Sequence, residues 1–440
     1  MVSDVLDDLD VLDAAPRTIA VPSGRGLWRF TLHRRDFTGS QTWQQTVLAE
    51  LTRARTRKLT QAWDAPSQLS FVVDGAAPEA AFIQELQHDV VAWRWDTQTG
   101  ADVPVFHGVV SASEDDLDEQ SHVVTFTCTD YVGMLARRYL TQGLTISGVG
   151  SDQDNIVGGL LTSATSGMQT TGGTSLAPGS NLAIVKGSAN PDGTVRMTLS
   201  GNVLTRTYQP QQSIGVALDE LAKCAGGFDY AAVPGQGGWG VAARSTLWVY
   251  YPQQGVVRAD NALVYGANLS QVRRQVSSDD YANYWRTIGN KQSASASTAQ
   301  LTADAWNSDA FGTVVGLWQN VDTGNNDVID LPTLQQRVAG DLNRFGVLIP
   351  VYTLTLRPNT WYLTTSGGVP TGFLNMGDTV QLVINHGRLN VNTWVRVMGI
   401  EYDVGDDGNE DVALIVGRPD KTLVHTLVKS RADVEALSRR

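Results

Sequence analysis

The chain has 440 residues, which is enough for two to four domains with hydrophobic cores of their own. Its formal net charge of −12 argues against affinity for nucleic acid through neutralised phosphates. The 2 cysteines are too few for a disulfide scaffold or a zinc site built on thiolates. The generous glycine content (43 residues) and the low charged fraction of 18% are typical of a loop-rich β protein.

Targeting signals are not evident. No apolar run reaches the ~18 residues that a membrane-spanning helix needs, so we expect no membrane insertion. Residues 1–16 carry five Asp and no Lys or Arg, so they predict an acidic arm and lack the basic region of a secretory signal. We therefore expect synthesis in a cytoplasm without export through a cleaved signal.

Alternating apolar and β-branched residues predict strands in the first third of the chain. The predicted strands cover residues 26–33, 68–74, 91–95, 106–110 and 123–128. A short helix with Pro78 in its first turn is expected over 78–87, and a closing helix over 131–140.

The composition changes sharply at residue 141. Gly, Ser and Thr supply 22 of residues 141–180, which indicates a domain boundary. Helices are expected over 154–161 and 213–224, the second capped by Ser213 and ended by Gly226. Strands are expected over 228–233 and 246–251.

The last third begins with a polar segment, residues 291–329. The clearest helix of the chain follows over 331–342, with Asp330 as its cap and an apolar face made by Leu334, Val338 and Leu342. Strands are predicted over 349–357, 379–385, 394–403 and 411–417, and an exposed helical tail from residue 421.

An internal repeat appears at an offset of 291 residues. Gly108 matches Gly399, the pair Asp115 and Asp116 matches Asp406 and Asp407, and Glu119 matches Glu410. Each set predicts a strand, an acidic hairpin loop and a second strand. Two related β-barrels at the two ends of the chain would explain the match, although acidic hairpins are common enough for a chance likeness.

These observations predict a mainly β protein with a few helices, in the α+β class. Two related β-barrel, tube-type domains flank a smaller mixed α/β domain. The expected boundaries are an acidic arm (1–16), a first barrel (17–140), an inserted α/β domain (141–258), a second barrel (259–420) with a polar insertion (291–329), and a C-terminal tail (421–440).

Motifs for catalysis or cofactors are weak or absent. The six histidines (His33, His88, His107, His122, His386 and His425) show no metal-ligand spacing, and no nucleophile elbow or P-loop occurs. The segment 235–240 matches Gly-x-Gly-x-x-Gly, but a strand follows it, so a hairpin loop is expected. The segment 403–408 resembles a calcium loop without its acid at the third position or its Glu at the twelfth. We expect no catalytic residue, no cofactor and no metal site.

The aromatic residues allow a second interpretation. Exposed Trp and Tyr rings stack on sugars, so a glycan-binding module is an alternative function. Most of the tryptophans lie within alternating strands, where a core position is expected: Trp93, Trp95, Trp248 and Trp394.

The order of motifs resembles the tail hub proteins of long-tailed phages, also called minor tail or tail-associated baseplate hub proteins, especially those of actinobacterial hosts. The excess of Arg over Lys agrees with the GC-rich genome of such a host. The resemblance runs from about residue 17 to 420, and its motifs are strand patterns without a chemical signature. It is carried by Ala65–Phe71, Phe106–Val110, Thr129–Tyr131, Ile214–Asp229, Tyr281–Tyr284, Gly377–Val380 and Arg396–Val397.

The resemblance implies a homotrimeric ring in the virion, at the phage tail tip, in which three chains with two barrels each match the sixfold tail tube. Such a hub joins the distal tail protein to tip or receptor-binding proteins, surrounds the tape-measure protein and lets DNA pass during ejection, without enzymatic activity. A distal tail adaptor, with one barrel, is the alternative within this class.

The acidic balance fits a channel wall that repels passing DNA. We therefore expect carboxylates of the two acidic hairpins to face the channel or a ring interface: Glu114, Asp115, Asp116, Asp118, Glu119, Asp403, Asp406, Asp407, Glu410 and Asp411.

Overall fold

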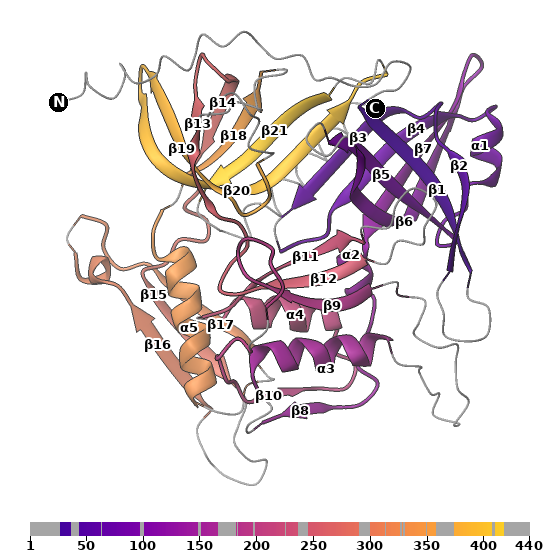
Figure 1. The fold of residues 1–440 in the computed structure, drawn as a ribbon. Helices are drawn as coiled ribbons and strands as arrows, with labels where there is room; N and C mark the ends of the chain where they lie inside the picture. Colours follow the sequence, from indigo (N-terminus) through magenta and orange to yellow (C-terminus); the bar gives the residue numbers. More distant parts are fainter. Residues whose placement is uncertain are drawn as a thin grey trace.

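A computed structural model gives the structure of the chain (Figure 1). It describes residues 27–36, 44–62, 64–96, 101–147, 151–165, 182, 184–196, 199–224, 226–235, 245–289, 300–312, 314–325, 328, 331–348, 350–357, 374–406 and 410–417. The expected acidic arm, the expected helical tail and Asp407 lie outside these residues.

The main element is one 13-stranded, mostly antiparallel sheet. One half of it comes from the N-terminal third of the chain: β1 (Trp28–Asp36), β2 (Gln44–Glu50), β3 (Arg55–Ala62), β4 (Gln68–Asp74), β5 (His88–Asp96), β6 (Ala101–Leu117) and β7 (His122–Asp130). The other half comes from the C-terminal third: β13 (Val257–Val264), β14 (Leu269–Gln275), β18 (Val351–Leu356), β19 (Thr379–His386), β20 (Leu389–Val404) and β21 (Glu410–Gly417). In Figure 1 the halves lie side by side.

The two halves repeat one strand order. The first half is ordered β2-β1-β5-β6-β7-β4-β3, and the second β13-β19-β20-β21-β18-β14. Leaving out β2, the strands correspond one to one in both spatial order and chain order. One difference is that β13 runs parallel to β19, whereas β1 runs antiparallel to β5.

The two outermost strands of each half follow one another directly in the chain. They are β2 and β3 in the first half, and β13 and β14 in the second. The turn 51–54 connects β2 to β3, and the turn 265–268 connects β13 to β14. No ladder joins either pair of strands in the described part of the chain, so two closed barrels are not confirmed.

A ladder between β3 and β20 joins the halves. Gly399 pairs with Ala62 and Val404 with Arg57, in an antiparallel register. The N-terminal part of β20 pairs with β19, and its C-terminal part pairs with β21. On the side of β20 where β19 lies, β3 pairs with the C-terminal residues that β19 does not reach. The apolar side chains of both halves consequently form one continuous core.

The ladders also correct the repeat offset. The β6–β7 ladder has a bulge between Val110 and Ala112, and the β20–β21 ladder has one between Val397 and Gly399. Equivalent residues of the first strands are therefore 287 apart, since 397 lies 287 beyond 110. The offset of 291 is wrong by four, so Gly108 and Gly399 do not occupy equivalent positions.

A second core lies below the sheet in Figure 1. It is built from α2 (Tyr131–Leu135), α3 (Gln153–Thr165), α4 (Ile214–Ala222), the pair β8 (Leu144–Ile146) and β10 (Arg206–Tyr208), and a three-stranded sheet of β9 (Ile184–Ala189), β11 (Asp229–Pro234) and β12 (Ser245–Tyr250). Ser213 caps α4 as expected, and accepts a hydrogen bond from the backbone N–H of Val216. The strands β11 and β12 are antiparallel neighbours. Apart from residue 235, the Gly-rich segment 235–240 lies outside the described residues.

A third, smaller core is inserted between β14 and β18. It contains β15 (Tyr284–Gly289), β16 (Thr302–Trp306), a 3-10 turn (Ser308–Phe311), β17 (Gln319–Asn325) and α5 (Leu331–Phe345). The expected helix over 331–342 is thus confirmed and extends to Phe345, with Leu334 and Val338 buried. The polar segment 291–329 contributes two of these strands, which the sequence did not predict.

The class of fold is confirmed, because β structure dominates and five helices accompany it among the described residues. Three details differ. The helix at Pro78 (α1) ends at Phe82, and the helix at Tyr131 ends at Leu135, so both are shorter than expected. Trp394 is 50% exposed and not part of the core.

Candidate functional site

The first acidic hairpin projects from the end of β6 and β7. Its turn is held by Asp118, whose carboxylate accepts hydrogen bonds from the backbone N–H groups of Gln120 and Ser121 at 2.7 and 2.6 Å. These bonds lower the pKa of Asp118. Asp115 lies 3.0 Å from His122 across the hairpin. Residues 112–121 are all exposed, Glu114, Asp116 and Glu119 among them, so this hairpin presents its acids to the outside of the chain.

The second hairpin is different, because Glu410 faces inward. Its carboxylate accepts hydrogen bonds from Trp28 Nε1 at 2.7 Å and from Arg94 Nε at 2.9 Å. The side chains of Arg94 and Glu410 are each 5% exposed. Trp28 also packs against Tyr402 at 5.1 Å between ring centroids. Glu410 is therefore part of an internal joint between the two halves of the sheet.

The other acids of this hairpin stay at the surface. Asp403 and Asp411 are exposed, and Asp403 lies opposite Lys58 in the β3–β20 ladder. Asp406 lines an open pocket of about 650 Å³ whose other charged residues are Asp74, Arg53, Arg55 and Arg57. Arg57 donates to the carbonyl of Gly405 at 2.5 Å and stacks over Phe30, which fixes the hairpin against the first half. The two hairpins, expected to be alike, thus have different surroundings.

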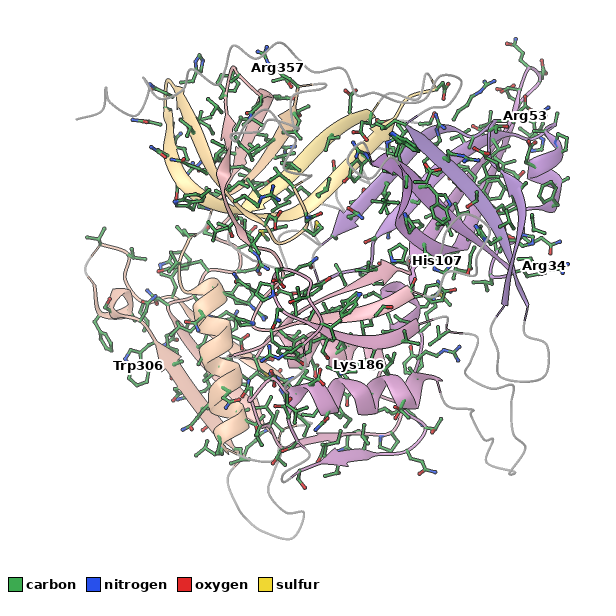
Figure 2. The ribbon with its side chains drawn as sticks, viewed as in Figure 1. Arg34, Arg53, His107, Lys186, Trp306 and Arg357 are labelled. Carbon is green, nitrogen blue, oxygen red and sulfur yellow. The ribbon has the colours of Figure 1, made fainter. Side chains whose placement is uncertain are left out.

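A Ser-His-Asp arrangement occurs where the first half meets the second core. Its histidine is His107, which is labelled in Figure 2. His107 Nδ1 lies 2.9 Å from Ser245 Oγ, and His107 Nε2 lies 3.2 Å from Asp89 Oδ2. The hydroxyl of Tyr131 donates to the same carboxylate oxygen at 2.8 Å. The sequence did not predict this cluster, because Ser245 is 138 residues from His107 and no local pattern links them.

The geometry of this cluster is that of a structural connection. In hydrolases of this type, Nε2 faces the serine and Nδ1 faces the acid, whereas here the two nitrogens are exchanged. His107 and Asp89 have side chains that are 0% exposed, and Ser245 is 1% exposed, so no substrate carbonyl reaches the hydroxyl. The cluster connects β5 and β6 to β12.

A second polar connection joins the second core to the C-terminal half. Arg396 on β20 forms a buried ion pair with Asp229 on β11, and also donates to the carbonyls of Gln254 at 2.6 Å and Gly377 at 3.0 Å. Asp229 in turn accepts from the backbone N–H of Gln254 at 2.6 Å. Both sheet halves are thus fixed to the second core by buried polar side chains.

Two further polar contacts join the second core to its neighbours. The backbone N–H of Tyr230 donates to Asp64 Oδ1 at 2.6 Å, and Arg337 on α5 pairs with Glu220 on α4 at 3.0 Å. The second core is therefore joined to each of the other two cores by charged or hydrogen-bonded pairs.

Among the described residues, no three His, Cys, Asp or Glu side chains come together in a way that would hold a metal ion. None of the helices in the described ranges is long and apolar enough to cross a membrane.

Two solved structures resemble the chain along nearly its whole length. A tail protein from Neisseria meningitidis MC58 matches with a TM-score of 0.50 at 11% identity, and covers 89% of this chain and 96% of its own. The 43 kDa tail protein of prophage MuSo2 from Shewanella oneidensis matches with a TM-score of 0.51 at 13% identity, and covers 88% and 97%. The chain has the fold of these phage-type tail proteins. No family model matches the sequence, and no curated protein does.

Proposed function

We propose that the chain is a structural hub of a phage tail tip. Three copies form a ring that joins the tail tube and its distal tail protein to the tip or receptor-binding proteins, and the ring surrounds the tape-measure protein and then the passing DNA. The observation that carries the proposal is the repeated strand order of the two halves. Three chains with two equivalent halves present six similar units, as a sixfold tube requires.

The chemistry of the buried charges supports a structural role over an enzymatic one. The Ser245–His107–Asp89 cluster is closed to substrates, and the remaining buried ion pairs connect cores. The net charge of −12 and the exposed acids of the β6–β7 hairpin suit a ring that does not retain DNA. We place the exposed carboxylates of the two hairpins at the channel or at the contact between copies.

The test is the mass of the purified chain in solution by light scattering, with negative-stain images of the same fraction. We expect a mass near three times 47.5 kDa and a threefold ring with a central hole. A particle with six copies and one sheet unit per sixth of the ring would instead favour the distal tail adaptor.

A glycan-binding virion module is the second candidate, and exposed aromatics favour it. Trp306 and Trp318 are 53% and 50% exposed, and Phe311 is 78% exposed. Their neighbours Val314, Val315 and Leu317 are exposed as well and carry no hydrogen-bonding groups for sugar hydroxyls. A monomer that binds purified cell-wall glycan, and loses that binding on Trp306→Ala, would replace the hub proposal with this one.

A further inference from the structure

The open pocket of about 650 Å³ beside Asp406 has an excess of basic groups. Three arginines line it against two acids, and one of these acids is already engaged, because Asp74 accepts a hydrogen bond from the backbone N–H of Ala76 at 2.9 Å. One of the arginines, Arg53, is labelled in Figure 2. We call this site the arginine pocket, and its lining residues are Thr52, Arg53, Ala54, Arg55, Arg57, Asp74, Ala76, Ala77 and Asp406.

Two of the three arginines can take a further anion. Arg57 is 9% exposed and donates to the carbonyl of Gly405 at 2.5 Å, so its position is fixed. The side chain of Arg53 is 62% exposed, and its contact with Glu79 is long, at 3.7 Å. Arg55 is exposed and makes no ion pair with any described residue. Arg53 and Arg55 are therefore the groups that an incoming carboxylate would meet.

The backbone beside these arginines is strained. Thr56 has a φ of +47, in the left-handed region that β-branched residues rarely adopt. The β3–β4 ladder has a bulge at the same place, between Arg55 and Lys58. Bulges and strained residues are enriched at functional sites, where they direct side chains. The local geometry of β3 thus agrees with a binding role for the pocket.

We infer that the acidic N-terminal arm, residues 1–16 of the same chain, binds in the arginine pocket. The arm supplies five Asp carboxylates and no Lys or Arg, so its charge is opposite to that of the pocket. Hydrogen bonds between guanidinium and carboxylate groups are among the stronger ones in proteins. The inference goes beyond the hub function and does not depend on it.

The topology of the first half brings the arm to this pocket. Because β1 is antiparallel to β2, the start of β1 lies at the same end of the sheet as the turn 51–54. The backbone N–H of Leu51 donates to the carbonyl of Phe30, only three residues after Leu27. Residues 17–26 separate the arm from Leu27 and can span about 33 Å, whereas the distance along β1 from Leu27 to Phe30 is about 10 Å. A tether of this length gives an effective concentration on the order of millimolar, so a modest affinity is enough.

A bound arm contacts both halves of the sheet. The turn 51–54 belongs to the first half, whereas Asp406 follows β20 of the second half, and both line the pocket. The pocket also lies at the end of the β3–β20 ladder, where Val404 pairs with Arg57. The arm therefore closes the joint between the halves from the outside.

Cysteine cross-linking tests the location of the arm. The variant Leu9→Cys with Thr52→Cys keeps every charge and places one thiol in the arm and the other in the pocket wall. The control, Leu9→Cys with Thr162→Cys, replaces an exposed threonine on α3, outside the pocket. The two native cysteines are buried and do not interfere. On mild oxidation in dilute solution we expect roughly tenfold more single-chain disulfide in the first variant, measured by peptide mass spectrometry. Adding Arg53→Glu and Arg55→Glu should reduce this yield to that of the control.

Hydrogen exchange tests the same contact without cysteines. Neutralising the arm should speed amide exchange of residues 51–57 roughly fivefold, because the pocket loses its occupant. The substitutions are Asp4→Asn, Asp7→Asn, Asp8→Asn, Asp10→Asn and Asp13→Asn. The matched control removes five charges from the β6–β7 hairpin and should leave this exchange unchanged. Its substitutions are Glu114→Gln, Asp115→Asn, Asp116→Asn, Asp118→Asn and Glu119→Gln.

Three outcomes would overturn the inference. Equal cross-linking with Thr52→Cys and with Thr162→Cys would show that the arm does not prefer the pocket. Equal exchange of residues 51–57 in the arm variant and in the parent would show that the pocket has no acidic occupant from the arm. A disulfide that joins two chains in place of the single-chain product would assign the pocket to the arm of another copy. All three outcomes leave the hub proposal standing, because that proposal is tested by the mass and the images of the particle.

Discussion

Arg94 and Glu410 form an ion pair that connects the two halves of the sheet from within. Arg94 Nε lies 2.9 Å from Glu410 Oε2, and each side chain is 5% exposed although the residues are 316 apart in sequence. The indole N–H of Trp28 donates to the same oxygen, so both Arg94 and Trp28 are hydrogen-bonded to the Glu410 carboxylate. The β3–β20 ladder holds the backbones of the halves together, and this pair fixes their side chains.

Glu410→Ala should therefore destabilise the chain strongly. Removal of the carboxylate leaves the Arg94 guanidinium buried without its partner, which costs about 3–5 kcal/mol of the free energy of unfolding. Urea denaturation followed by tryptophan fluorescence measures the loss. Asp304→Ala is the matched control, because Asp304 pairs with Arg286 at 2.7 Å in an exposed setting and should change stability far less. Similar losses for the two variants would contradict the role of Glu410.

His33 should make the chain less stable in mild acid. Burial lowers the pKa of His33 to about 4, whereas an unfolded histidine titrates near 6.5. Between those pH values His33 binds a proton in the unfolded chain but not in the folded chain. The contribution of the neutral His33 to the free energy of unfolding is therefore complete above pH ~6.5 and is lost as the pH falls toward about 4. The loss amounts to about 3 kcal/mol.

The measurement is urea unfolding at pH 7 and at pH 4.5 for the parent and for His33→Gln. The difference between the two pH values should shrink in this variant. His386→Gln serves as the control, since it makes the same replacement at an exposed position outside the core. An unaltered acid loss in His33→Gln would show that other groups are responsible.

Ser245→Ala should lower stability without affecting any chemistry. It leaves the buried Nδ1 of His107 without its partner at 2.9 Å, which costs about 1–3 kcal/mol. A fluorophosphonate probe, which labels activated serines, should not modify Ser245 in the folded chain, because that residue is 1% exposed. Peptide mass spectrometry measures the labelled fraction of Ser245. Stoichiometric labelling would indicate a hydrolase.

Gly255→Ala should disturb the connection between the second core and β19. Gly255 has φ +84, and a Cβ there would lie 2.0 Å from the carbonyl carbon of Gly377. Gly193 is the matched control, because its φ of +82 is nearly the same but nothing lies within 4 Å of its Cβ position. Gly193→Ala should cost about 1 kcal/mol, as expected for a left-handed residue. Gly255→Ala should lower the thermal midpoint much further, and equal midpoints would contradict the contact.

Local sequence signals predicted the elements that carry their own pattern. The strand at Gln68–Asp74 and the helix after Ser213 agree with the structure, because alternation and capping are decided within a few residues. The strand β3 was missed, since its sequence Arg55–Ala62 is mostly polar and its pairing depends on β20, far along the chain.

The repeat shows the same limit. The matching acids at the offset of 291 occupy different places: Asp115 and Asp116 are strand residues of β6, whereas Asp406 lies in the turn after β20. Matching by residue type alone therefore aligned strand residues of β6 with a turn residue that follows β20. The positions of the bulges, which only the ladders reveal, give the correct offset of 287. The inward position of Glu410 and the Ser245–His107–Asp89 cluster likewise depend on contacts between distant segments.

The long separation between β3 and β20 also has a consequence for synthesis. Arg57 and Gly405, at one end of the joint, are 348 residues apart, which a ribosome takes on the order of 20 to 70 s to cover at ~5–20 residues per second. During that time the basic edge of β3 is exposed on a half-made chain. The exposed acidic end of the β6–β7 hairpin of a neighbouring nascent chain carries the opposite charge and can contact it. Chains made on one crowded messenger thus risk joining in the wrong order before their own β20 exists, and slow translation would increase that risk.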